Sequence, residues 1–164
     1  MKTLSWDDVD STAEKLANQI KESKFDPDCI IGVTTGGLFP LALLAIRIKG
    51  KSIFTITAKK EKQGETDSVT IANLPNFDLK GKSVLLVDEI AQSGSTLKTI
   101  ADVIKKECGV GILKTATLAA NTDVCENWPD YYVLVEEGDW IVFPWENGDE
   151  FAPYDLKRRN EEHA

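Results

Sequence analysis

The most informative segment of this chain reads Val84-Leu85-Leu86-Val87-Asp88-Glu89-Ile90-Ala91-Gln92-Ser93-Gly94-Ser95-Thr96. Its four leading apolar residues are typical of a parallel strand that is buried on both faces. Two carboxylates, Asp88 and Glu89, stand where we expect this strand to end, and a helical pattern begins at about Ser95. Ligands of open α/β sheets bind outside the carboxyl ends of the strands, and a helix N-terminus attracts anions. The segment therefore places an acidic pair beside a phosphate-binding loop.

Apolar periodicity on either side of this segment predicts alternating helices and strands. Ser5 precedes the first helical pattern and Asp8 follows three residues later, which predicts a capping box. The alternation predicts an α/β domain of three layers, with a mostly parallel twisted sheet flanked by helices. The expected helices cover residues 6–24, 38–48 and 96–108, and the expected strands cover residues 29–34, 52–58, 68–72, 84–87, 112–119 and 131–135.

The stretch 59–67 differs from its surroundings because it contains no apolar residue. It lies between two expected strands, so we predict a mobile loop at the tip of a hairpin. Its lysines, Lys59, Lys60 and Lys62, are candidates for a loop that closes over a bound substrate and excludes water. An ordinary exposed hairpin tip is the competing interpretation.

Composition and charge restrict the classes of function. A length of 164 residues favours one domain, and 42% hydrophobic and 28% charged residues are ordinary for a globular protein. The net charge is −8; residues 121–164 contribute −9 and residues 1–120 contribute +1. Duplex nucleic acid binds chiefly to cationic patches, so we expect no nucleic-acid partner. No apolar run reaches the length of a membrane span and the N-terminus lacks a signal-peptide core, so we expect a cytoplasmic protein without a membrane partner.

Histidine and cysteine usage excludes several catalytic designs. The only histidine, His163, lies in a polar tail over 155–164. Ser-His-Asp or Cys-His catalysis and a histidine-based metal site are therefore not expected. The cysteines Cys29, Cys108 and Cys125 are scattered without metal-ligand spacing, and we interpret them as reduced, mostly buried thiols.

Three interpretations compete for the segment Val84–Thr96. It can be an ordinary strand and helix, a Walker B strand of an ATPase, or a sugar-phosphate site. A P-loop ATPase also needs a glycine-rich loop that ends in Lys-Ser/Thr. The glycine turn over 32–38 is not followed by a lysine. The ATPase interpretation therefore fails.

The segment resembles the signature of the type I phosphoribosyltransferases, which is four apolar residues, two acids and a loop ending in Thr-Gly-x-Thr or a close variant. Residues 30–40 resemble their pyrophosphate-binding loop, and residues 129–132 and 140–146 resemble the C-terminal hood of the xanthine/guanine branch. The resemblance covers roughly residues 3–150. It implies a single phosphoribosyltransferase-like domain over 1–164, with the hood contributed by about 120–150.

The resemblance implies transfer of a 5-phosphoribosyl group from phosphoribosyl pyrophosphate to a purine-like base, with release of pyrophosphate and with Mg²⁺ as cofactor. Asp88 would also contact the metal indirectly, through the substrate. Family members of this type are usually dimers or tetramers, so a homo-oligomer is implied. The implied catalytic residues are Asp88, Glu89 and Gln92; those for phosphate and pyrophosphate are Ser93, Gly94, Ser95, Thr96, Thr34, Thr35, Gly36 and Gly37; those for the base are Asn121, Trp140 and Ile141.

Three of these positions depart from the purine branch. Its members typically carry an aspartate at the place of Gln92, a cation at the place of Thr35, and a lysine near Asn121. The departures leave two hypotheses open: a phosphoribosyltransferase with an atypical base site, or a non-catalytic regulatory protein that binds phosphoribosyl pyrophosphate or a nucleotide. A domain that has lost ligand binding is a third possibility. For Trp140 and Ile141, core packing is the competing interpretation.

Overall fold

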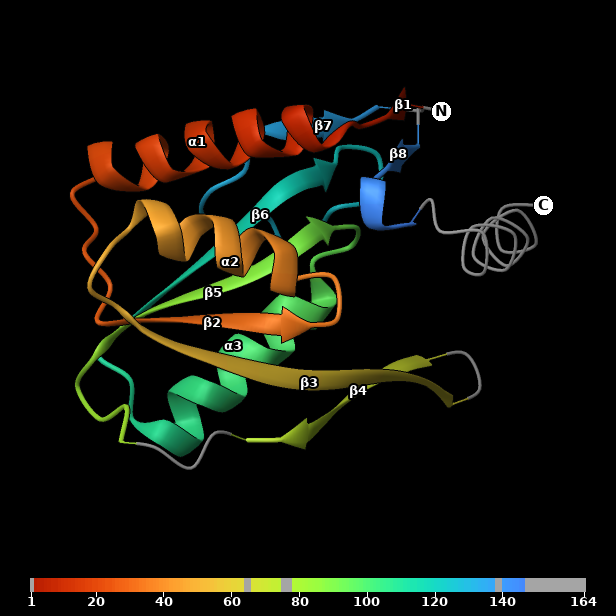
Figure 1. Cartoon of the computed structure of the whole chain (residues 1–164). Coiled ribbons are helices and arrows are strands. Elements are labelled where there is room, and N and C mark those ends of the chain that lie inside the picture. The colour runs from red at the N-terminus through yellow and green to blue at the C-terminus, as the bar shows by residue number, and fades with distance from the viewer. Residues whose placement is uncertain (1, 64–65, 75–77, 138–139, 147–164) are drawn as a thin grey trace.

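The computed structural model describes residues 2–63, 66–74, 78–137 and 140–146 as a sheet with helices on both faces (Figure 1). The main sheet has six strands in the order β4-β3-β2-β5-β6-β7. Only β3 and β4 pair antiparallel. The strands are β2 (Cys29–Thr34), β3 (Ser52–Gln63), β4 (Thr66–Asn73), β5 (Ser83–Ala91), β6 (Ile112–Asn121) and β7 (Leu134–Glu136).

The sheet separates two hydrophobic cores. Helices α1 (Trp6–Glu22) and α2 (Leu38–Arg47) cover one face, and α3 (Ser95–Cys108) covers the other (Figure 1). Side chains of β5 alternate between the two cores, with Leu85 and Val87 facing α1 and α2 and with Val84 and Leu86 facing α3. All four are fully buried. The predicted three-layer architecture and the doubly buried central strand are therefore confirmed.

A second, two-stranded sheet ties the N-terminus to the hood. Strand β1 (Lys2–Thr3) pairs in parallel with β8 (Ile141–Val142), and a 3₁₀ turn, Pro144–Glu146, follows β8. The sequence did not predict this pairing, because two-residue strands carry no periodic pattern. Among the helices of the described chain, none combines the length and the hydropathy that a membrane crossing requires.

Several predicted boundaries are wrong. Strand β5 continues to Ala91, so the acidic pair lies within the strand and not at its end. Most of the predicted loop 59–67 is strand, because β3 and β4 extend as an antiparallel hairpin; residues 64–65 lie outside the described part. The strand expected at 131–135 is shifted to Leu134–Glu136, with Tyr131 forming one isolated bridge. The first helix ends two residues early.

The predicted capping box begins α1. The Ser5 hydroxyl accepts from the Asp8 amide at 3.1 Å, and the Asp8 carboxylate accepts from the Ser5 amide at 2.8 Å. The Ser5 hydroxyl also donates to Asp8 Oδ2 at 2.6 Å. This side-chain hydrogen bond, followed by the one from the Ser5 amide, lowers the pKa of Asp8. A lowered pKa means that the contribution of this carboxylate to stability is complete above the ordinary aspartate range and is lost as the pH falls through the lowered value.

We expect Ser5→Ala to lower the free energy of unfolding by about 1 kcal/mol, because the helix loses its N-cap. The measurement is urea denaturation at neutral pH, repeated in acid, where the difference between variant and wild type should shrink. Ser11→Ala is the matched control, since Ser11 is exposed within the same helix. An equal loss in both variants would contradict the role of the cap.

Candidate active site at the carboxyl end of the parallel strands

Two glycines bring the turn after β2 against β5. A Cβ added to Gly37 would lie 2.8 Å from the Val87 carbonyl oxygen, and one added to Gly36 would overlap the Glu89 carboxylate. Backbone atoms cannot yield as flexible side chains do, so only glycine fits at Gly37. The peptide between Thr34 and Thr35 is cis. The predicted pyrophosphate loop and the acidic pair therefore touch in space.

The acidic pair is held by its own backbone and by the hood. The Glu89 amide donates to Asp88 Oδ1 at 2.8 Å, and the Trp145 indole N–H donates to Glu89 Oε2 at 2.6 Å. Trp145 also stacks on Phe39 of α2, with ring centroids 4.3 Å apart and planes 5° apart. The hood thus fixes the orientation of Glu89 through a residue that the sequence analysis did not assign to the site.

We expect Trp145→Phe to lower kcat/KM by about 10- to 100-fold, because a hydrogen bond to a charged group is worth about 1.5–3 kcal/mol while the aromatic stack is retained. Steady-state kinetics are the measurement. Trp128→Phe is the control, since Trp128 is 44% exposed and lies away from the acidic pair. If both variants were equally active, the hydrogen bond from Trp145 to Glu89 would have no part in the activity.

The phosphate-type loop connects β5 to α3, and contacts with the segment 126–127 hold it in place. Gly94 has φ +74°, and its Cα packs against the backbone of Asn127. The Ser93 carbonyl accepts from the amides of Glu126 and Asn127 at 3.2 and 3.1 Å. The Ser93 hydroxyl donates to the Ser95 hydroxyl at 2.9 Å. These bonds hold a loop whose amides and hydroxyls can bind an anion.

One cavity joins the loop to the acidic strand. Its volume is about 200 Å³, and it is lined by Asp88, Ile90, Ala91, Gln92, Ser93, Gly94, Thr96 and Leu97. A carboxylate and the N-terminus of α3 thus face the same space. Of the motif residues that the sequence predicted for the site, Asp88, Gln92, Ser93, Gly94 and Thr96 line this cavity, whereas Glu89 and Ser95 do not.

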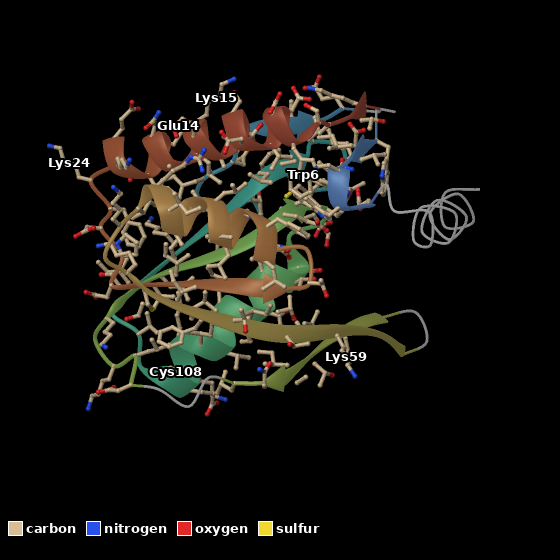
Figure 2. All side chains as sticks on the ribbon, viewed as in Figure 1. Trp6, Glu14, Lys15, Lys24, Lys59 and Cys108 are labelled. Atoms are coloured by element: carbon tan, nitrogen blue, oxygen red, sulfur yellow. The ribbon has the colours of Figure 1, made fainter. Side chains whose placement is uncertain are left out.

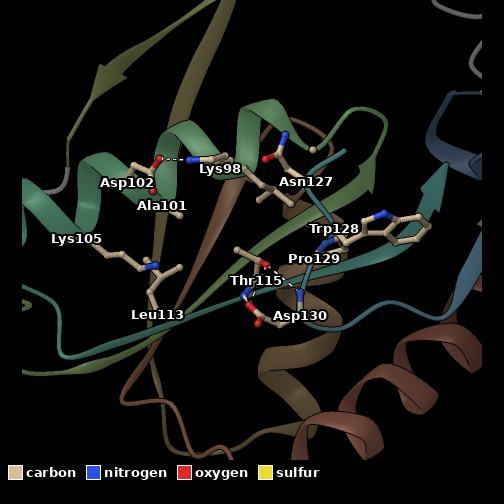
Figure 3. A pocket seen from close by; sticks show the side chains of 12 residues that line it. Lys98, Ala101, Asp102, Lys105, Leu113, Thr115, Asn127, Trp128, Pro129 and Asp130 are labelled. Atoms are coloured by element: carbon tan, nitrogen blue, oxygen red, sulfur yellow. Dashed lines mark hydrogen bonds and ion pairs between the residues drawn. The ribbon is translucent and has the colours of Figure 1, made fainter. Parts of the chain in front are cut away.

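A larger cavity lies on the other side of this loop. Its volume is about 270 Å³, and it runs between α3 and the segment 127–130 (Figure 3). Within it, Lys98 pairs with Asp102 at 2.6 Å, and Asp130 accepts a hydrogen bond from the Thr115 amide at 2.8 Å. It contains neither carboxylate of the motif, so we place the candidate active site in the smaller cavity.

Gln92, Asn121 and a third residue form a hydrogen-bonded chain. Asn121 Nδ2 donates to Gln92 Oε1 at 2.9 Å, and Gln92 Nε2 donates to Glu136 Oε2 at 3.1 Å. Glu136, at the end of β7, is 3% exposed. The sequence analysis predicted Gln92 and Asn121 but missed Glu136. The signal available was a carboxylate next to the last expected strand.

The remaining predicted residues are placed as follows. Ile141 is buried in the core that contains α1, so its side chain packs as the competing interpretation expected. Trp140 is half-buried, and its carbonyl accepts from the Lys2 amide at 2.7 Å. Lys59 is exposed on β3, where Figure 2 shows it at the hairpin. The side chains of Lys60 and Lys62, and the polar tail 155–164, lie outside the described part.

Thiol chemistry has no support in the geometry. Cys29 and Cys125 are buried, Cys108 is half-buried at the end of α3, and none forms a disulfide. Burial raises the pKa of all three thiols. A raised pKa keeps the neutral thiol at physiological pH, which is the weaker nucleophile. The expectation of reduced, mostly buried thiols is therefore confirmed.

An acidic strand, a phosphate-type loop and a glycine turn meet at one edge of a parallel sheet, which is where α/β proteins bind phosphorylated ligands. The sequence profile of the phosphoribosyl transferase domain matches residues 5–152. This chain belongs to that family.

Individual relatives agree with this assignment. The chain is 29% identical to xanthine-guanine phosphoribosyltransferase of Desulfotalea psychrophila, with 91% of this chain and 88% of the relative covered. A crystal structure of purine phosphoribosyltransferase from Pyrococcus horikoshii is 36% identical, covers 89% of this chain and 94% of its own, and superposes with a TM-score of 0.78. The Helicobacter pylori xanthine-guanine-hypoxanthine phosphoribosyltransferase, 21% identical, shares the fold over 98% of both chains with a TM-score of 0.79.

Family membership confirms the predicted resemblance and the predicted fold. It also confirms the predicted enzyme class, a transferase that moves a 5-phosphoribosyl group from phosphoribosyl pyrophosphate to a nitrogenous base. The family generally uses Mg²⁺ with this substrate. The matched proteins give no support to the non-catalytic alternative.

Proposed function

We propose that this chain transfers the phosphoribosyl group to a purine base, forming a nucleoside monophosphate and pyrophosphate. The observation that carries the proposal is the single cavity in which Asp88 faces the loop from Gln92 to Thr96. The relative from Desulfotalea psychrophila is named a xanthine-guanine phosphoribosyltransferase and the structure from Pyrococcus horikoshii a purine phosphoribosyltransferase, which supports the choice of base class.

The phosphate loop would bind the 5-phosphate. The amides at the N-terminus of α3 and the hydroxyls of Ser93, Ser95 and Thr96 supply donors, and Gly94 allows the close approach of the backbone. Asp88 and Glu89 would accept hydrogen bonds from the ribose 2- and 3-hydroxyls. Their negative charge also lies where the sugar ring becomes positive as the bond to pyrophosphate lengthens, so they stabilise the transition state.

The turn Thr34-Thr35-Gly36-Gly37 would bind the pyrophosphate. Thr35 offers a hydroxyl and no positive charge, so the charge of the leaving group must be offset elsewhere. The neighbouring carboxylates of β5 are oxygen donors of the kind that Mg²⁺ prefers. Within the described residues no cluster of three or more His, Cys, Asp or Glu side chains forms. This donor set fits an ion held largely by substrate oxygens, with Asp88 in indirect contact, that neutralises the pyrophosphate when bound.

The base would lie between the loop and the hood, near Gln92 and Asn121. Trp140 offers an aromatic surface for stacking, and Ile141 would contribute through its backbone because its side chain is buried. The hairpin segment that carries Lys59, Lys60 and Lys62 would close over the bound substrate and exclude water. We therefore infer one catalytic domain over 1–164, with the hood contributed by about 120–150.

We also infer a cytoplasmic homo-oligomer, either a dimer or a tetramer. Exposed apolar side chains on α1 and α2, namely Trp6, Leu38 and Ile46, support a contact between copies. Sedimentation would measure the assembly.

The test of the proposal is release of pyrophosphate from phosphoribosyl pyrophosphate and Mg²⁺ with a panel of purines and pyrimidines. We expect turnover with at least one purine, none with pyrimidines, and loss of activity when the metal is removed with EDTA and its recovery when Mg²⁺ is restored. Calorimetric binding of phosphoribosyl pyrophosphate without turnover of any base would overturn the proposal and favour a regulatory protein.

A further inference from the structure

The Asn121–Gln92–Glu136 chain lies at the carboxyl ends of three neighbouring parallel strands, β6, β5 and β7. Ala91 at the end of β5 is in register with Ala120 of β6, and Asn121 of β6 is in register with Glu136 of β7. Gln92 follows β5 directly. The three side chains therefore meet at the edge where open α/β sheets bind ligands.

The hydrogen bonds of this chain have one direction. The Asp123 amide donates to Asn121 Oδ1 at 2.9 Å, Asn121 donates to Gln92, and Gln92 donates to Glu136. A backbone N–H can only donate and an ionised carboxylate can only accept, so the two ends fix which way each amide points. Reversing either amide would set donor against donor or acceptor against acceptor.

We propose that Glu136 is a positioning residue that, with the Asp123 amide at the other end of the chain, holds the amides of Gln92 and Asn121 in one direction and thereby sets the choice of base. This rests on the proposed function. Each amide has one more N–H and one more lone pair than the chain uses. Their positions are fixed, so the site presents a defined pattern of donors and acceptors without any cation. Such a pattern distinguishes a 6-oxo purine from a 6-amino purine, whose donors and acceptors are exchanged along that edge.

The burial of Glu136 restricts its movement and therefore the movement of the amide that it holds. Glu136 is 3% exposed, and its own carbonyl accepts from the Thr122 amide at 3.0 Å, which holds its backbone in place. A buried carboxylate that is hydrogen-bonded to an amide leaves that amide little freedom to turn. Glutamine in its place can either donate or accept, so the direction of the Gln92 amide would be held only from the Asn121 side and no longer by the buried carboxylate.

The test compares Glu136→Gln with Glu137→Gln, the same change at the exposed neighbouring residue. Calorimetry measures the dissociation constants of inosine and adenosine 5-monophosphates and of phosphoribosyl pyrophosphate. We expect wild type to distinguish the two nucleotides by about tenfold, which is one hydrogen bond. Glu136→Gln should lower the ratio to about three, because only the Asn121 side still orients Gln92, without changing the affinity for phosphoribosyl pyrophosphate. Glu137→Gln should keep the wild-type ratio.

A wild-type ratio near one, or an unchanged ratio in Glu136→Gln, would overturn the inference. If circular dichroism shows that Glu136→Gln does not fold, the double variant Gln92→Glu with Glu136→Gln replaces it. That exchange keeps every bond of the chain and leaves only lone pairs at position 92, so the ratio should move toward the 6-amino nucleotide; an unmoved ratio again overturns the inference. The proposed function fails separately, when nucleotides bind but no base turns over.

Discussion

Asp88→Asn should lower kcat by about 10²- to 10³-fold, the loss seen when one group that stabilises transition-state charge is removed. Asp88 lines the cavity beside the phosphate loop, and asparagine keeps its shape while removing its charge. The affinity for phosphoribosyl pyrophosphate should change much less than kcat, because the loop and the glycine turn remain intact. Steady-state kinetics with the best base are the measurement.

Asp102→Asn is the matched control for this charge. Asp102 lies on α3 with a 58% exposed side chain and pairs with Lys98 four residues earlier. A surface pair of this kind is worth at most about 1 kcal/mol of stability, and it is not in the smaller cavity. If the two variants were equally active, Asp88 would have no part in the chemistry.

Gly94→Ala should lower the free energy of unfolding by about 2–4 kcal/mol, combining a left-handed backbone with overpacking, and should abolish binding of phosphoribosyl pyrophosphate. The backbone has φ +74° at this residue, and an added Cβ would lie 2.7 Å from the carbonyl carbon of Asn127. To relieve the overlap, the segment that holds Ser93 must move, and the loop moves with it. Urea denaturation and calorimetry measure the two effects.

Gly50→Ala is the control, because it introduces the strain of a left-handed backbone without any steric overlap of the added Cβ. Gly50 has φ +79°, but an added Cβ would meet no atom within 4 Å. We therefore expect only the cost of the left-handed conformation, about 1–2 kcal/mol, and unchanged ligand binding. Retained binding in Gly94→Ala would show that the contact with Asn127 does not shape the loop.

Local patterns predicted the elements that have one clear physical cause. The apolar run Val84–Val87 predicted β5 because a strand buried on both faces has no alternation. Ser5 and Asp8 predicted the start of α1 because the capping box acts over three residues. The loop at 59–67 was wrong for a physical reason as well. Its backbone groups pair across the hairpin, and this pairing does not depend on apolar side chains.

The residues of the candidate site were likewise predicted where they are neighbours in sequence and missed where they are not. The motif located Asp88 and the phosphate loop, because these residues are neighbours in sequence. Glu136 and Trp145 were missed because they reach Gln92 and Glu89 across 44 and 56 residues. Such contacts depend on the register of β7 and on the path of the hood, which side-chain periodicity does not encode.

The measurement that tests the central claim most directly is the stoichiometry of the complete reaction. Phosphoribosyl pyrophosphate, Mg²⁺ and a purine are incubated with the enzyme, and nucleoside monophosphate and pyrophosphate are quantified together by mass spectrometry and a coupled assay. The account predicts equal amounts of the two products and neither product with Asp88→Asn on the same time scale. Pyrophosphate released without nucleotide, or nucleotide formed equally well by Asp88→Asn, would contradict it.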